Sequence, residues 1–448
     1  MLLRGVHAVL PLLLRYRSRR WLTAGITRIE VDRIETLVEL YRQFQAREIR
    51  LFLAFRHPEV DDPMSFLYVL SRSIPRAARQ QGIALRSPLH AHYLYDRGMP
   101  LWGGAWLGWL LSRLGGVPIH RGRRLDLKAI RAARDLAANG RLPMAIAPEG
   151  ANNGHSERIG PLELGMSQLG FWCAEDLHKA GRKERVIVVP MGVRYRFVQP
   201  PWKPLDRLLS RLETECGLTV DAVDLADEEK RGEHCARRLR RLGDRLLSDM
   251  EEFYRRLEPR LAVESGLTAG NEQELGDRLQ VVLDTALRVA ESQFGLSSAG
   301  TLSARCRRIE EAGWMAIYRE DLPALDAVSP VQRRLADWEA EAAEAAVRHM
   351  RLVESFVAVS DDYACDRPTV ERLAEVASIL SDCMARIQGI EIPKRPQLGK
   401  RWVQLTVREP IEIGDRWPLY SRDRQGAKQA VKDLTEDLRV ALEEAIAD

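Results

Sequence analysis

The chain has 448 residues, of which 45% are hydrophobic and 29% charged, and its formal net charge is +4. This length exceeds one ordinary domain, so we expect two domains or one domain with a large insertion, and the hydrophobic fraction excludes an intrinsically disordered chain. The small net charge argues against a general nucleic-acid binder, whereas the arginine-rich clusters favour particular anionic contacts.

The cysteines and histidines give no metal signature. His90, His92 and His120 come without a matching set of ligands. The cysteines are scattered without a CxxC pair, which fits a reducing compartment and predicts no metal site. They are Cys173, Cys216, Cys235, Cys306, Cys365 and Cys383.

The chain begins with an apolar segment, residues 2–14, which Arg4 and Pro11 interrupt and an arginine-rich flank follows. It is shorter than the roughly 20 apolar residues that span a bilayer. We predict that residues 1–24 lie on an anionic membrane surface with the basic flank near the headgroups. The alternatives are a first helix packed on the domain and a targeting peptide, although no small-residue cleavage site follows.

Strand and helix patterns alternate up to about residue 200. Thr27–Val31 predicts a strand, residues 35–45 a helix, and Leu51–Phe55 a short buried strand. Further strands are expected at 117–120, 144–147 and 185–191, the last ending at Pro190, and further helices at 63–80, 126–139 and 164–180. Such alternation is typical of an α/β fold with a mixed central sheet and helices on both faces.

The strand Leu51–Phe55 leads directly into His57, and Asp62 and Pro63 follow as a helix start, with Asp62 as N-cap. This spacing places an imidazole at the carboxyl edge of a strand and a carboxylate on the first turn of the next helix. The two side chains can then form a hydrogen bond, and a histidine held in this way is a general base for a hydroxyl group. The alternative is that His57 is a polar turn residue and Asp62 only a cap.

The segment 99–112 carries no charge and has Trp102, Trp106 and Trp109 at helical spacing, opposite a set of glycines. Tryptophans along one face suit a membrane interface or a groove for an acyl chain. Packing in the protein core is the alternative.

Helical patterns dominate after about residue 205, with stretches near 274–293, 329–358 and 369–388. A strand pattern returns at Trp402–Val407, and a last helix is expected from about residue 424. We therefore predict that residues 25–204 and 396–448 form one α/β domain and that residues 205–395 are a helical insertion into it.

A basic cluster lies on the long helix around residue 240, opposite its apolar stripe, so we expect the cluster to face outward. It is either a solvated face or a docking surface for a small acidic protein or anionic headgroups. Its members are Arg237, Arg238, Arg240, Arg241 and Arg245.

Four blocks carry a resemblance to a known family. They are His57-x4-Asp62, Gly116-Val117-Pro118-Ile119-His120-Arg121, Pro148-Glu149-Gly150 and Val186-Ile187-Val188-Val189-Pro190. In this order they resemble the glycerolipid acyltransferase superfamily, and in particular the 1-acylglycerol-3-phosphate acyltransferases. The resemblance covers about residues 25–200 and resumes at 402–448, where Arg408-Glu409-Pro410-Ile411 is similar to the family's last strand.

The resemblance implies transfer of an acyl group from acyl-CoA or acyl-carrier protein to a lysophospholipid, most simply 1-acylglycerol-3-phosphate. It implies a peripheral location on the cytoplasmic face of a membrane, no further cofactor and no nucleic-acid partner. His57 and Asp62 would be catalytic, and the acceptor would be bound by Arg121, Glu149, Gly150 and Asn152. Another acceptor, or a non-catalytic membrane scaffold, remains the alternative, and Glu149 has the alternative role of capping the next helix.

The chain departs from the family pattern at several positions. Arg56 precedes the histidine where asparagine is common, and Ala147 replaces an aromatic residue. Ala151-Asn152 stands where the family commonly has Thr-Arg, and Glu163 lies in a region that is often basic. These changes keep the reaction type and leave the acceptor open. Other cations that could replace the missing arginine are Arg123, Arg124 and Arg158.

Overall fold

The computed structural model describes residues 2–20, 22–96, 98–99, 104–119, 127–150, 152–222, 227–267, 274–319, 328–356, 363, 366–390 and 392–447. The chain divides into two compact units. The first contains Met1–His120, Leu125–Pro200 and Gly399–Asp448, and the second contains Pro201–Leu398. The first unit is thus assembled from segments on both sides of the second.

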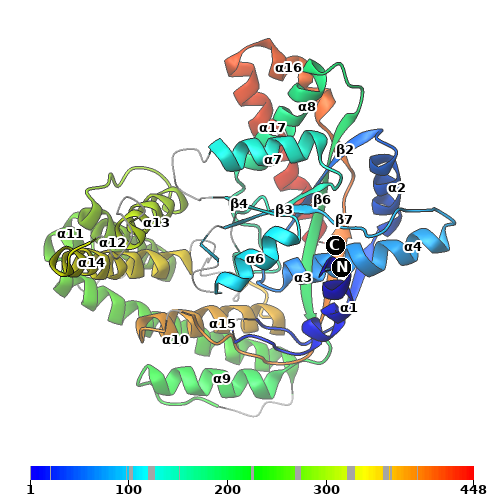
Figure 1. The fold of residues 1–448 in the computed structure, drawn as a ribbon. Helices are drawn as coiled ribbons and strands as arrows, with labels where there is room; N and C mark the ends of the chain where they lie inside the picture. The colour runs from blue at the N-terminus through cyan, green and yellow to red at the C-terminus, as the bar shows by residue number, and fades with distance from the viewer. Residues whose placement is uncertain are drawn as a thin grey trace. The chain divides into compact units, whose positions relative to one another are not determined.

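One mixed sheet organises the first unit (Figure 1), with the strand order β1-β7-β6-β2-β5-β3-β4 and β8 beside β6. Strands β6, β2, β5, β3 and β4 run parallel, whereas β7 is antiparallel to β6 and parallel to β1. The strands are β1 (Ile26–Asp32), β2 (Ile49–Phe55), β3 (His92–Asp96), β4 (Gly116–Ile119), β5 (Met144–Ile146), β6 (Arg185–Phe197), β7 (Arg401–Val407) and β8 (Ile411–Glu412). The predicted α/β fold with a mixed central sheet is confirmed.

Helices cover both faces of this sheet, and β2 is buried along its whole length. Successive side chains of a strand point to opposite faces of the sheet. A first helical layer therefore packs against Leu51, Leu53 and Phe55, and a second layer packs against Phe52 and Ala54. The first layer holds α1 (Leu2–Arg15), α2 (Ile34–Gln45), α3 (Asp62–Tyr68), the π-helical turn Val69–Ser73 and α4 (Ile74–Gln80). The second holds α7 (Leu127–Asn139), α8 (Leu164–Lys179) and α17 (Arg424–Ala447), with α16 (Trp417–Arg422) packed beside α17.

The strand predicted at Trp402–Val407 is confirmed as β7, and it lies in the same sheet as the strands before residue 200. The prediction that the preceding strand ends at Pro190 is wrong, because β6 continues to Phe197. Beyond Pro190 the strand is held by β7, with Met191–Phe197 opposite Arg401–Val407. A partner some 200 residues later along the chain therefore extends the strand past the proline.

The second unit contains seven helices among its described residues. They are α9 (Trp202–Glu215), α10 (Glu228–Leu257), α11 (Pro259–Glu264), α12 (Leu275–Phe294), α13 (Leu302–Tyr318), α14 (Pro330–Glu354) and α15 (Val370–Ile387). The expectation that the arginine cluster of α10 faces outward is wrong for Arg238, which is 1% exposed. Its guanidinium donates to both oxygens of Glu213, at 3.0 and 2.7 Å. Glu213 on α9 is itself buried and requires a cation, which explains why one arginine turns inward.

Candidate functional site

The candidate site lies where parallel strands of the sheet end. His57 follows β2, and Glu149 follows the neighbouring strand β5. Polar side chains after adjacent parallel strands meet at one edge of the sheet, which is the usual place for a site in an α/β fold. The backbone N–H of His57 donates to Glu149 Oε1 at 3.3 Å, so the two loops are in direct contact.

His57 and Asp62 form the expected pair, with His57 Nδ1 lying 3.1 Å from Asp62 Oδ2. The Asp62 side chain is 1% exposed, whereas that of His57 is 23% exposed. Burial raises the pKa of the Asp62 carboxyl, and its hydrogen bond to His57 acts in the opposite direction. With Nδ1–H donating to the carboxylate, Nε2 is the basic nitrogen of the imidazole. The arrangement is that of an oriented general base.

Asp62 is the first residue of α3 and not its N-cap, which is Asp61. The prediction of Asp62 as N-cap is therefore wrong, although the carboxylate does lie on the first turn. Besides contacting His57, Asp62 Oδ2 accepts a hydrogen bond from the backbone N–H of Glu59 at 2.7 Å. The second oxygen, Oδ1, accepts from the Tyr195 hydroxyl at 2.5 Å. Asp62 is thus held by three donors around one buried carboxylate.

A buried charged layer supports this pair. Asp61 accepts from the backbone N–H groups of Thr23 and Ala24 at 3.0 and 2.9 Å, and burial raises its pKa from 3.8 to about 6. Arg401 of β7 pairs with Glu59 at 2.9 Å and lies 3.5 Å from Asp61. The same guanidinium stacks over the ring of Tyr195, 4.5 Å from its centroid. Arg401 of β7 therefore holds Glu59, Asp61 and Tyr195 in place around the His57–Asp62 pair.

Glu149 is buried and points into the protein. Its Oε1 accepts from His57 N and from Arg56 Nε, each at 3.3 Å. Its Oε2 accepts from Asn153 Nδ2 at 2.8 Å and from Gly160 N at 2.9 Å. These four contacts make Glu149 the connection between the His57 backbone and the loop that follows β5. Its predicted role in binding an acceptor stays a prediction.

Arg56 is fully buried and holds that same loop. It donates to the backbone carbonyls of Ser156 at 2.6 Å and His155 at 3.0 Å, and also to that of Arg158. A buried guanidinium needs such acceptors around it, because its charge cannot be neutralised by losing a proton. The arginine that departs from the family pattern therefore shapes the loop beside His57.

Gly150 and Asn152 belong to this loop. Gly150 has φ of 73°, and a Cβ there would lie 2.8 Å from Glu163 Oε1. A larger residue would therefore be strained and would also collide with Glu163. Asn152 is half-buried. The loop is tied to the His57 loop by a hydrogen bond from Gly154 N to Pro58 O at 3.0 Å.

The structure thus brings five predicted site residues together in the two segments that follow β2 and β5. The sixth, Arg121, lies outside the described residues, as do Arg123 and Arg124. Sequence reasoning noted Arg56 only as a departure and missed Tyr195 and Arg401. The alternation of apolar residues in Val193-Arg194-Tyr195-Arg196-Phe197 is a strand signal that could have placed Tyr195. The five residues are His57, Asp62, Glu149, Gly150 and Asn152.

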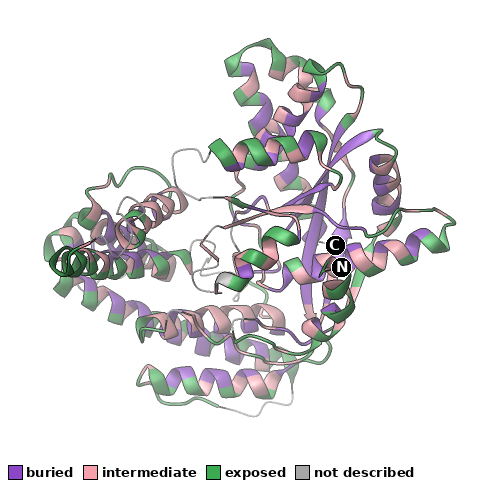
Figure 2. Ribbon diagram, in the orientation of Figure 1, coloured by how far each residue is buried: buried purple, intermediate pink, exposed green. Residues whose placement is uncertain are grey.

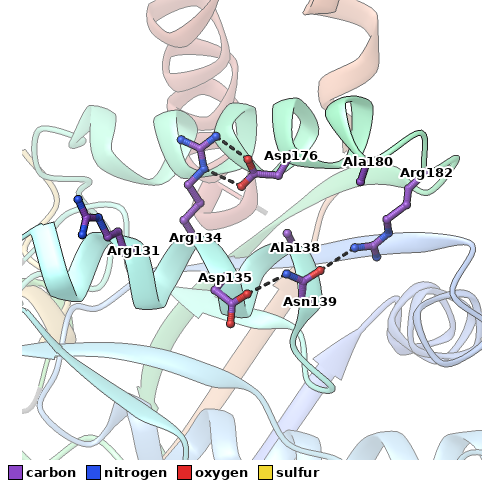
Figure 3. Close-up of a pocket in the computed structure, with 8 residues that line it drawn as sticks. All are labelled: Arg131, Arg134, Asp135, Ala138, Asn139, Asp176, Ala180 and Arg182. Carbon is purple, nitrogen blue, oxygen red and sulfur yellow. Dashed lines mark hydrogen bonds and ion pairs between the residues drawn. The ribbon is translucent and has the colours of Figure 1, made fainter.

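A separate polar pocket lies between α7 and α8 (Figure 3). Arg134 is paired with Asp176 there by two hydrogen bonds of 2.6 Å, and Arg182 donates to Asn139 Oδ1 at 2.8 Å. Arg50, near the amino end of β2, donates to the carbonyl of Ala137, and the next residue, Ala138, lines this pocket. The pocket is therefore at the opposite end of β2 from His57, and its paired arginines are not placed to assist the histidine.

Within the described ranges, no group of three or more His, Cys, Asp or Glu side chains could hold a metal ion. In the same part of the chain, no helix has the length and apolar character needed to cross a membrane. Comparisons of the chain with family models, with curated proteins and with solved structures find no match. The functional argument therefore rests on the residues and geometry of the site.

Proposed function

We propose that the chain is an acyltransferase that esterifies a hydroxyl of a lysophospholipid, most simply 1-acylglycerol-3-phosphate, using an acyl thioester donor. The observation that carries the proposal is the contact of 3.1 Å between His57 Nδ1 and the buried Asp62 carboxylate at the carboxyl end of β2. The sequence blocks that resemble the glycerolipid acyltransferases support the same reaction.

In the proposed reaction, His57 Nε2 removes the proton of the acceptor hydroxyl as its oxygen attacks the thioester carbonyl. The tetrahedral intermediate then collapses, the carbon–sulfur bond breaks, and the imidazolium returns the proton to the leaving thiolate. Asp62 stays ionised throughout and stabilises the imidazolium. The products are an ester and a free thiol, and the histidine ends in its starting state.

The acceptor side of the proposal rests on Arg121, which follows β4 in the sequence as His57 follows β2. A guanidinium suits a phosphate because it can donate two parallel hydrogen bonds. The loop after β5 lacks the arginine that the family commonly places there, since Asn152 stands at that position. The choice among phosphate-bearing acceptors is therefore the part of the proposal that most needs measurement.

The test is thiol release by the purified chain, measured with acyl-CoA and with acyl-carrier-protein donors against a panel of lysophospholipids. We expect release that depends on a lysophospholipid, with 1-acylglycerol-3-phosphate the preferred acceptor. A donor without acceptor gives the background rate of hydrolysis. Thiol release that no acceptor increases would contradict the proposal and favour the membrane scaffold.

We also propose a peripheral membrane surface on the first unit. Val9 and Leu12 of α1 and Tyr16 just after it are 46%, 59% and 67% exposed, although Leu10 and Leu14 of α1 are buried. Trp106 and Trp109 of α6 (Ala105–Arg113) are 46% and 52% exposed, so core packing is wrong for these two tryptophans. Trp102 lies outside the described residues.

A basic contact joins α6 to the segment that follows α1, because the Arg19 guanidinium lies 5.1 Å from the centroid of the Trp106 ring. Exposed apolar and aromatic side chains beside arginines are typical of a segment that lies in the headgroup region of an anionic bilayer. Arg4, Arg15 and Arg20 are exposed nearby in the sequence and add to the positive charge.

We expect the double variant Leu12→Ser/Trp109→Ser to bind vesicles of anionic phospholipid much more weakly, by about tenfold or more, because it lacks two large apolar side chains that would insert into the bilayer. Flotation of the protein with vesicles measures this binding. Val198→Ser is the matched control, since Val198 is 51% exposed in the same unit and lies outside this surface. Equal flotation of the double variant and the wild type would overturn the assignment of the surface.

A further inference from the structure

The first half of α14 contains no buried residue. The buried residues of α14 are Ala343, Ala346, Val347, Met350 and Val353, all in the second half of the helix. From Pro330 to Ala342 every residue is exposed or half-buried, as Figure 2 shows by its green and pink colouring of this helix. The first half therefore contributes little to the core of the second unit.

This exposed half carries an apolar stripe. Val331, Leu335 and Trp338 are 71%, 54% and 56% exposed, and Ala342 continues the row. The spacings of four, three and four residues are those of a coiled-coil seam, in which apolar side chains recur every 3.5 residues on average. A row of large apolar side chains in water is unfavourable, and this one is long enough for a helix–helix contact.

One flank of the stripe carries a positive charge near the start of the helix and a negative charge two turns later. Arg334 lies toward the start of the helix, and Glu341 lies two turns later on the same flank, where their side chains pair at 3.1 Å. Both side chains are more than half exposed, so this pair contributes little to stability and either partner can exchange it for another.

We propose that two copies of the chain associate through this stripe, with the two helices antiparallel about a two-fold axis between Leu335 and Trp338. In that register Leu335 packs against Trp338 of the second copy, and Val331 packs against the small Ala342. Arg334 faces Glu341 of the second copy, and by symmetry the same ion pair forms twice.

The stripe is complementary to itself, which favours a second copy over an unrelated partner. Large side chains meet in the centre, a large one meets a small one at each end, and Arg334 meets the oppositely charged Glu341 at the flank. The contact is short, since the twelve residues from Val331 to Ala342 extend roughly 17 Å along the helix. A dimer of moderate affinity that forms with rising protein concentration is the consequence.

The experiment is light scattering or sedimentation equilibrium of the full chain over a series of concentrations, without membranes. We expect the molar mass to rise from that of one chain toward that of two at micromolar concentrations. The double variant Leu335→Asn/Trp338→Gln should raise the dissociation constant at least tenfold. Val263→Asn is the matched control, because Val263 on α11 is 72% exposed in the same unit and lies outside the stripe.

A charge exchange tests the register. Arg334→Glu places two like-charged pairs in the interface and should raise the dissociation constant several-fold, and the added change Glu341→Arg should restore it. A wild-type chain that stays monomeric at all these concentrations overturns the proposal. So does a dimer that the Leu335→Asn/Trp338→Gln variant leaves unchanged. A dimer without the rescue overturns the antiparallel register. None of these outcomes depends on the proposed enzymatic activity.

Discussion

Replacement of His57 by alanine is expected to lower the turnover number by about 10²- to 10⁴-fold, because the variant lacks the proposed general base. Asp62→Asn should retain more activity, since the imidazole remains but loses the charge that stabilises its protonated form. Both rates are measured by thiol release with the best donor and acceptor from the panel. His57 is only partly buried, so the substitution should leave the fold intact.

The control for His57→Ala is His178→Ala, which removes an exposed imidazole at the end of α8. This variant should match the wild type in both turnover and circular dichroism. Near-normal turnover in a folded His57→Ala protein would show that the histidine is not the base, and the proposed reaction would then need another residue.

The second large effect is expected from Tyr195→Phe, which removes the hydroxyl that donates to Asp62 Oδ1 at 2.5 Å and keeps the ring under Arg401. A hydrogen bond to a charged group contributes about 1.5–3 kcal/mol, so turnover should fall roughly 10- to 100-fold. Because Tyr195 is buried and contacts Asp62, we expect the Michaelis constants to stay unchanged. Tyr195 is in this sense a positioning residue.

The pH profile distinguishes this role from a loss of packing. Burial already raises the pKa of Asp62, and the Tyr195 hydroxyl is one of the groups that oppose this rise. Without the hydroxyl the pKa of Asp62 rises further, so the acidic limb of the profile should move to higher pH. Tyr41→Phe is the matched control, since its buried hydroxyl donates to His90 O at 3.3 Å in the same unit. An unchanged acidic limb in Tyr195→Phe would contradict the positioning role.

The sequence was sufficient for those parts of the fold that depend on local pattern. Leu51–Phe55 is continuously apolar, and the observed strand begins only two residues earlier, at Ile49. The return of a strand at Trp402 is visible from the alternation of Val403, Leu405 and Val407 with the polar residues between them. His92–Asp96 was not predicted as a strand, because all five of its residues are half-buried and it carries no clear apolar run.

The pairing of His57 with Asp62 was predictable because both residues lie in one turn, five positions apart. The sequence pattern predicts that the strand ends at Pro190 and therefore does not place Tyr195 in it. The strand continues only through pairing with β7, and nothing near Pro190 in the sequence shows that partner. Arg238 was placed wrongly for a similar reason, since the buried Glu213 that turns it inward belongs to another helix.

The position of β7 between β1 and β6 also determines when the sheet can be completed during synthesis. β1 pairs with β7 along most of its length, and β7 begins 369 residues after the end of β1, at Arg401 and Asp32 respectively. At about 5–20 residues per second, β1 waits on the order of tens of seconds for its neighbour. Asp61 and Glu59 wait almost as long for Arg401, so the His57–Asp62 pair gains this support only after Arg401 has been synthesised. Chains stalled before Arg401 should leave β1 open to protease, and chains released after Val407 should protect it.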